Sequence, residues 1–129
     1  MTNQRGPPIW TLFHTLAEKI KDEHYMTIAP KLVEFIKRIC SLLPCPDCQD
    51  HASTYWRVTR YSLTSKDKLQ DFLFNFHNAV NQRKNYSIEN NHILNLYKDK
   101  RLAQVYNDFV VVFMSRTTSR LMTDSLHRK

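Results

Sequence analysis

Apolar residues three and four positions apart recur along the chain, and this spacing marks one face of an α-helix. The first such stripe predicts a helix over residues 8–21. The second predicts a helix that begins near Pro30, because a proline in the first turn lacks only an N–H that has no partner there. The two stripes are Ile9, Phe13, Leu16 and Ile20, then Leu32, Phe35, Ile36, Ile39 and Leu43.

Three further helical segments follow. A third helix is predicted from Cys45 to about Thr59, with Ala52, Tyr55 and Trp56 facing inward. A fourth begins after residues 64–67, which resemble a capping box. A fifth lies beyond Asn90-Asn91, and its polar tail after about Ser115 is expected to fray. The last two stripes are Leu69, Phe72, Leu73, Phe76 and Val80, then Leu102, Val105, Tyr106, Phe109, Val110 and Phe113.

These elements predict an all-α fold. The chain of 129 residues contains a single glycine, and few tight hairpins are expected from such a composition. Four helices with short connections favour an antiparallel four-helix bundle. We expect a core over 1–90 and a helical C-terminal extension over 91–129, which covers its apolar stripe on the core or at a dimer interface.

Charge and cysteine content narrow the class of protein. The formal net charge is +7, but lysine and arginine are spread over the chain, so a solvated surface is favoured over nucleic-acid binding. Three cysteines cannot form a disulfide framework. No signal peptide and no membrane-spanning apolar run are visible. We therefore expect a soluble, cytoplasmic protein, in which a C-x-x-C pair is more often catalytic or metal-binding than structural.

The most informative segment is the C-x-x-C pair, Cys45 and Cys48. Pro46 suits the first position of a helix, which would put Cys45 at the N-cap. Unpaired backbone N–H groups there stabilise a thiolate, which makes a disulfide of the pair easy to reduce. Zinc ligation together with His51, and either His14 or His77, is the main alternative, and we expect no metal.

A redox dithiol needs an electron acceptor, and nothing else on the chain is redox-active, so a cofactor is expected. Aromatic and polar side chains on the neighbouring helices offer it a site. Trp10 and His14 share a helix face because they are four residues apart. The remaining candidates are His51, three residues after Cys48, and His77, Asn78 and Asn81 at one end of the fourth helix.

Three ordered motifs make the chain resemble the Erv/ALR family of FAD-linked sulfhydryl oxidases. They are W-T-x-x-H at Trp10–His14, C-x-x-C-x-x-H at Cys45–His51 and H-N-x-V-N at His77–Asn81. The resemblance covers roughly residues 6–90 and implies a four-helix bundle that binds FAD as a homodimer. The small size is similar to that of viral members, which would place the protein in host cytoplasm or virion.

The resemblance also implies residue roles. Cys45 would be the sulfur that a substrate thiolate attacks, and Cys48 would face the flavin. Arg83 or Lys84 would meet the pyrophosphate of FAD. The other implied FAD contacts are Gly6, Trp10, His14, His51, His77, Asn78, Val80 and Asn81.

The implied reaction converts thiols and O2 to a disulfide and H2O2. Its expected partners are protein dithiol substrates or a thioredoxin-like relay protein. Cys40 is the only cysteine left, so one chain has no second shuttle pair, and Cys40 is expected to be a buried, inert thiol. A zinc-binding module and a basic helical adaptor without catalysis remain the alternatives.

Overall fold

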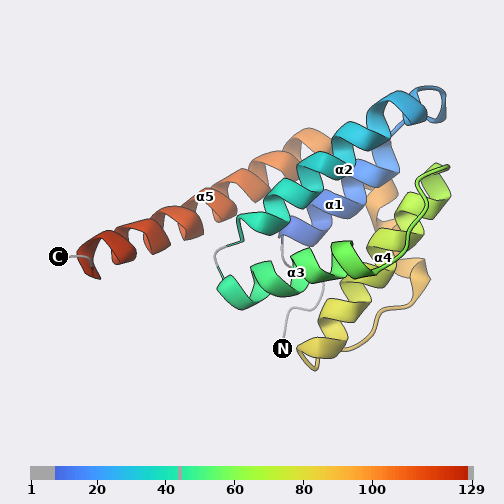
Figure 1. Cartoon of the computed structure of the whole chain (residues 1–129). Helices are drawn as coiled ribbons and strands as arrows, with labels where there is room; N and C mark the ends of the chain where they lie inside the picture. Colours follow the sequence, from blue (N-terminus) through green and yellow to red (C-terminus); the bar gives the residue numbers. More distant parts are fainter. Residues whose placement is uncertain (1–7, 44, 128–129) are drawn as a thin grey trace.

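The computed structural model describes residues 8–43 and 45–127, with side chains described as far as Met114. This part of the chain contains helices and no strand, which confirms the all-α class (Figure 1). Its elements are α1 (Pro8–Lys19), the 3-10 helix η1 (Asp22–His24), α2 (Tyr25–Ser41), α3 (Pro46–Val58), α4 (Lys66–Arg83), the 3-10 helix η2 (Asn91–Asp99) and α5 (Leu102–His127).

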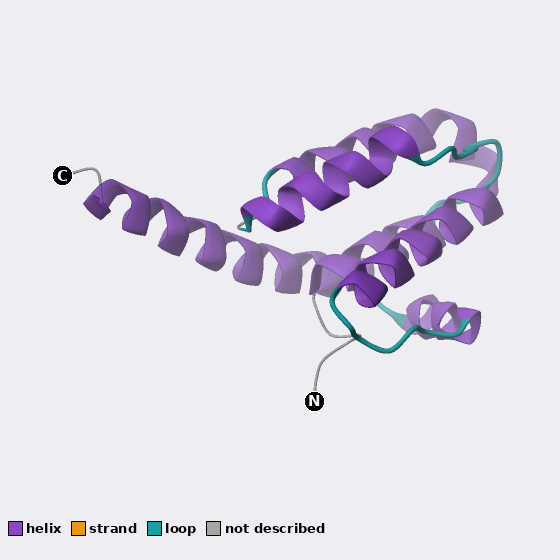
Figure 2. Ribbon diagram, turned by 60° about the horizontal axis from the view of Figure 1, so that its bottom comes forward, coloured by secondary structure: helices purple, strands orange, loops and turns teal. Residues whose placement is uncertain are grey.

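The helices pack in two groups. α1 lies against α4, η2 and α5, whereas α2 lies against α3. The C-terminal part of α5 extends past the other helices in both views (Figures 1 and 2). None of the described helices is long and apolar enough to cross a lipid bilayer.

One apolar core joins all five α-helices. Leu12 of α1, Ile36 of α2 and Leu69 of α4 have no exposed surface, and α3 contributes Ala52 and Trp56. The first turns of α5 belong to the same core. Val105 and Phe109 are each 6% exposed within it.

Most of the predicted stripes are buried or partly buried, with two exceptions. Phe35 is 37% exposed and Tyr106 is 46% exposed, so neither faces the core as predicted. Both lie beside true core positions, Ile36 and Val105, one residue along the helix. A stripe read from spacing alone is wider than the strip of helix that another helix covers.

The predicted start of α2 is wrong. The helix begins at Tyr25, and Pro30 lies inside it rather than in its first turn. Tyr25 and Ala29 are 4% and 1% exposed, so burial of the residues before the proline extends the helix upstream. This burial outweighs the loss of the hydrogen bond that proline cannot donate.

The C-terminal end also differs from the prediction. α5 continues to His127, whereas fraying was expected from about Ser115. No proline or glycine occurs between residues 102 and 127, so the backbone meets no residue that would end the helix.

Candidate active site

The start of α3 holds Cys45 and Cys48. Cys45 is the N-cap, and its Sγ accepts a hydrogen bond from the backbone N–H of Cys48 at 3.3 Å. Pro46 is the first residue of the helix, as the sequence predicts. Cys45 is exposed, Cys48 is half-buried, and both thiols are free. One sulfur of the pair is therefore open to a large reactant, and the other faces partly into the protein.

The two thiols have opposite electrostatic settings. Hydrogen bonds from the side chain and the backbone N–H of Cys48 lower the pKa of Cys45. Burial and its bond to Cys45 raise the pKa of Cys48, while the charges of Lys84 and Arg83 lower it in part. In the reduced pair, negative charge is thus favoured on Cys45. The end of α4 lies close enough to act on Cys48, so the structure brings these two predicted residues to the dithiol.

A second group of predicted residues lies buried between α1 and α4. The rings of Trp10 and His77 are stacked, with centroids 4.2 Å apart and planes at 6°. His14 Nε2 lies 3.0 Å from His77 Nδ1, so one ring donates a hydrogen bond to the other. The exposed fractions are 8% for Trp10, 3% for His14 and 2% for His77. We call these three residues the ring cluster.

The ring cluster is uncharged at His14. Burial, with a smaller contribution from His77, lowers the pKa of His14 from 6.5 to about 3. A neutral imidazole beside an indole is a flat, weakly polar surface. Such a surface is suited to an aromatic ligand or to another aromatic ring.

Asn81 follows His77 by one helical turn and is 2% exposed. Its Nδ2 is buried and has no hydrogen-bond partner among the described residues. An unpartnered buried amide donor costs free energy, and a bound ligand with an oxygen or nitrogen acceptor would remove that cost. Asn81 is therefore the observation of this structure that best fits a bound polar cofactor.

Asn78 has a different set of bonds. Its Nδ2 donates to the carbonyl of Glu89 at 3.0 Å, and its Oδ1 accepts from the Glu89 N–H at 2.9 Å. The amide thus holds the segment after α4, in which Asn85 takes a positive φ of 63°. The predicted cofactor contact of Asn78 stays a prediction.

The structure says less about the other residues that were predicted to contact FAD. Val80 is half-buried against the core, and His51 is exposed one turn after Cys48. Gly6 lies outside the described residues. Among the residues that the structure describes, no three His, Cys, Asp or Glu side chains are grouped so that they could hold a metal ion.

Sequence reasoning missed Tyr97. It lies in η2, is 3% exposed, and its ring stacks on His14 with centroids 4.9 Å apart. The signal was present in the spacing of Ile93 and Tyr97, which are four apart and both buried. That segment is short and polar around them, so the pattern did not stand out.

The chain is similar in sequence to a known protein family. Residues 7–100 match the model of the Erv1 / Alr family. This range contains the dithiol, the ring cluster and Asn81. No solved structure matches the chain.

Two viral relatives illustrate the similarity. "Putative FAD-linked sulfhydryl oxidase 096R" of Invertebrate iridescent virus 3 is 38% identical over 84 residues, which cover 62% of this chain and 55% of that protein. The "FAD-linked sulfhydryl oxidase" of African swine fever virus is 30% identical over 83 residues, 64% of this chain and 70% of that protein. The chain thus spans about half the length of the first relative.

Proposed function

The chain belongs to the Erv1 / Alr family, and from this membership we propose that it is an FAD-linked sulfhydryl oxidase. It converts pairs of protein thiols to disulfides and delivers the electrons to O2, which becomes H2O2. The observation that carries the proposal is the exposed Cys45 and half-buried Cys48 at the start of α3, inside the matched range and beside the cationic end of α4.

The thiol chemistry follows from the exposure of the two sulfurs. A substrate thiolate attacks Sγ of Cys45 in the oxidised pair, so the Cys45–Cys48 bond breaks and Cys48 leaves as a thiolate. The second substrate thiol then attacks the mixed disulfide, which releases the oxidised substrate and leaves Cys45 reduced. Two electrons and two protons have moved from the substrate.

The positions of Cys48 and its neighbours support the division of roles. Cys48 is the less exposed sulfur; burial raises the pKa of its thiol, and the positive charges of Lys84 and Arg83 offset part of that rise. Cys45 is open to a protein substrate. Bound FAD would accept the electron pair from the dithiol, and the Cys45–Cys48 disulfide would re-form as that pair leaves. The flavin would then pass the pair to O2.

The residues present fit FAD. Asn81 offers a buried, unpartnered amide donor, and Trp10 and His14 offer flat, uncharged ring surfaces. Arg83 or Lys84 would hold the negative pyrophosphate. The remaining contacts that we assign to FAD are Gly6, Cys48, His51, His77, Asn78 and Val80.

Partners and location are part of the proposal. The substrates are protein dithiols, presented directly or through a thioredoxin-like relay protein, and the enzyme acts as a homodimer in host cytoplasm or the virion. Cys40 is not a shuttle thiol in this scheme. It is 2% exposed, and burial raises the pKa of its thiol to about 11, with the Trp56 side chain offsetting part of the rise.

The proposal is tested by the visible spectrum of the purified protein and by its oxygen uptake with dithiothreitol. We expect a flavin band near about 450 nm and O2 consumption with H2O2 formation. Protein that stays colourless with added FAD and consumes no oxygen would rule out the proposed activity. A zinc assay would then test the alternative.

A further inference from the structure

Residues 84–90 connect α4 to η2 and are not helical. The backbone turns at Asn85, whose φ of 63° is a left-handed conformation that asparagine adopts more readily than most residues. After this turn the chain runs back beside the last part of α4 (Figure 1). We call residues 84–90 the return segment.

Three hydrogen bonds hold the return segment against α4. Asn78 uses both ends of its amide on Glu89, because its Nδ2 donates to the Glu89 carbonyl at 3.0 Å and its Oδ1 accepts from the Glu89 N–H at 2.9 Å. The N–H of Tyr86 donates to the backbone carbonyl of Asn81 at 2.7 Å. The segment therefore lies beside residues 78–81 of the helix.

Apolar burial contributes little to this position. Every residue of the return segment except Glu89 is exposed. Its two large apolar side chains, Tyr86 and Ile88, are 40% and 56% exposed. A segment with few buried apolar contacts opens locally at a low cost in free energy. Its closed position thus depends on the three hydrogen bonds, and two of them belong to Asn78.

The return segment passes a buried polar group. Asn81 lies three residues after Asn78, so the two side chains are neighbours on α4. It is 2% exposed, and its Nδ2 has no hydrogen-bond partner among the described residues. One turn earlier on the helix, His77 belongs to the buried ring cluster. The return segment is therefore the weakly held part of the cover near Asn81.

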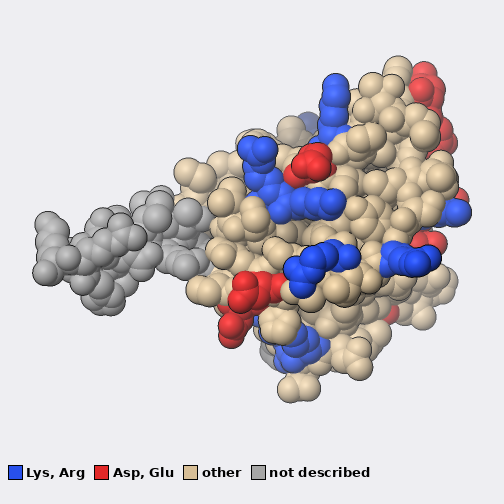
Figure 3. Space-filling view, in the orientation of Figure 1, with Lys and Arg blue, Asp and Glu red and all other residues tan. Residues whose placement is uncertain are grey.

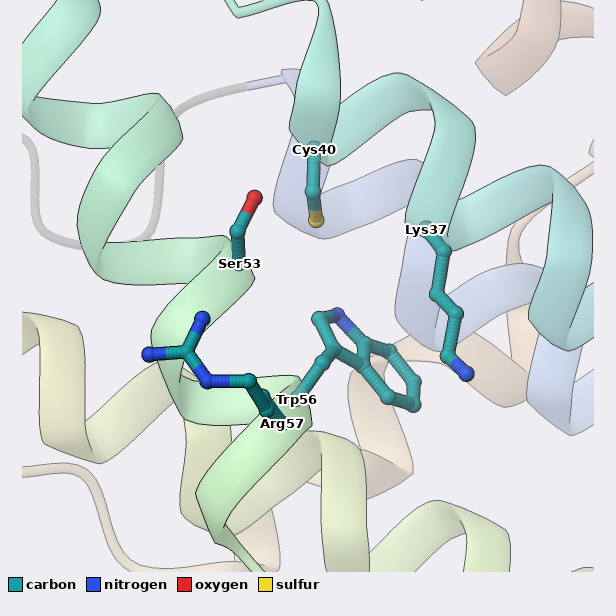
Figure 4. A pocket seen from close by; sticks show the side chains of 5 residues that line it. All are labelled: Lys37, Cys40, Ser53, Trp56 and Arg57. Atoms are coloured by element: carbon teal, nitrogen blue, oxygen red, sulfur yellow. The ribbon is translucent and has the colours of Figure 1, made fainter.

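A second buried donor provides a contrast. Trp56 lines a cavity of about 270 Å³ between α2 and α3 (Figure 4). Its side chain hydrogen-bonds to the thiol of Cys40, which lines the same cavity. This donor is used within the chain, whereas the Nδ2 of Asn81 is left for a ligand.

Positive charge lies where the return segment begins. Arg83 and Lys84, at the end of α4, are both exposed. Lys and Arg side chains appear on the surface at this end of the helix (Figure 3). Cations at an entrance raise the local concentration of a negative ligand.

We propose that Asn78 is a latch that holds the return segment closed near Asn81, and that FAD enters and leaves when this latch opens. The inference rests on the proposed function, which assigns FAD to Asn81. In this role Asn78 is a positioning residue, because it acts on the cofactor through Glu89 and the return segment. A latch slows both entry and exit of the cofactor, whereas a direct contact slows only its exit.

The two rates of FAD binding test the latch. Asn78→Ala removes both bonds to Glu89, so association and dissociation, followed by flavin fluorescence after rapid mixing and after dilution, should each become about tenfold faster. Glu89→Pro removes only the N–H bond and leaves the Asn78 side chain available to FAD, and it should raise both rates roughly threefold. Asn75→Ala, at an exposed position of the same helix, should leave both rates unchanged.

Amide hydrogen exchange of the full chain tests the latch without a measurement of FAD binding. In the wild type, the N–H groups of Tyr86 and Glu89 should exchange more slowly than those of the exposed residues between them. In Asn78→Ala both should lose this protection, although the bond from Tyr86 to Asn81 does not involve the substituted side chain. A joint loss would show that the return segment opens as one unit.

Two results would overturn the latch. An unchanged association rate in Asn78→Ala, even with faster dissociation, would make Asn78 a direct contact only. Protection of the Tyr86 N–H that persists in this variant would show that the return segment does not depend on Asn78. Wild-type protein that binds no FAD would contradict the proposed function instead, and hydrogen exchange would still decide whether Asn78 holds the segment.

Discussion

The two parts of the candidate active site are built in opposite ways. The dithiol lies at the start of α3, where Cys45 is exposed and the charges of Arg83 and Lys84 reach Cys48. The ring cluster of Trp10, His14 and His77 is almost completely buried and, at His14, uncharged. A group that must meet a protein substrate needs access. The FAD contact that we propose for the ring cluster needs rings in fixed positions instead, and burial supplies them.

The largest expected effect comes from removing the inner sulfur. Cys48→Ala should reduce oxidase turnover to the uncatalysed rate, because Cys45 then has no partner for a disulfide. The flavin should stay bound, since the ring cluster and Asn81 are unchanged. Oxygen uptake with dithiothreitol and the visible spectrum measure the two properties separately.

Cys40→Ala is the matched control for that variant, because it also removes one sulfur. It should keep turnover, although the loss of a buried side chain reduces stability slightly. Oxidase activity that persists in Cys48→Ala, or disappears in Cys40→Ala, would contradict the assignment of the reactive pair.

A smaller effect is expected at the ring cluster when the pH falls. The pKa of His14 is lowered from 6.5 to about 3, so the unfolded chain binds a proton at higher pH than the folded one does. The contribution to stability is complete above pH 6.5 and is lost as the pH falls toward 3. Between pH 7 and pH 5 the free energy of unfolding should fall by about 2 kcal/mol through this group.

Urea unfolding of wild type and His14→Gln at both pH values tests this expectation. The variant should lose this part of the pH dependence whatever its absolute stability. His92→Gln changes an exposed histidine and should keep it. An identical decrease in wild type and His14→Gln would show that His14 is not the group responsible.

Both parts of the site could be anticipated from the sequence, for different reasons. Cys45 as the N-cap of α3 follows from Pro46 and local chemistry alone. The contact of His14 with His77 joins residues 63 positions apart, so it depended on the family resemblance and on the apolar stripes that bring α1 to α4. Tyr97 and the upstream start of α2 were missed, because tertiary burial decides both.

A roughly tenfold effect is expected at Asn81, one helical turn after His77 of the ring cluster. Asn81→Leu removes the unpartnered amide donor, so the affinity for FAD should fall about tenfold. The apoprotein should lose little stability, because the amide Nδ2 makes no hydrogen bond in it. Asn75→Leu, at an exposed position of the same helix, should leave FAD affinity unchanged. Titration of the apoproteins with FAD measures the affinity of each variant. Equal affinities of Asn81→Leu and Asn75→Leu would show that Asn81 does not contact the cofactor.

The smallest expected difference is one of stability, and it follows from the double role of Cys45. Its Sγ caps α3 by accepting the N–H of Cys48, and the same atom is the proposed target of the substrate. Serine is a better capping residue than alanine by about 1 kcal/mol, and it cannot form a disulfide. Cys45→Ser should therefore abolish turnover while keeping the stability of the reduced protein, whereas Cys45→Ala should lose both turnover and about 1 kcal/mol. Chemical unfolding under reducing conditions compares them. Equal stability of the two variants would mean that the capping bond contributes nothing, and that the position of Cys45 at the start of α3 serves its reactivity alone.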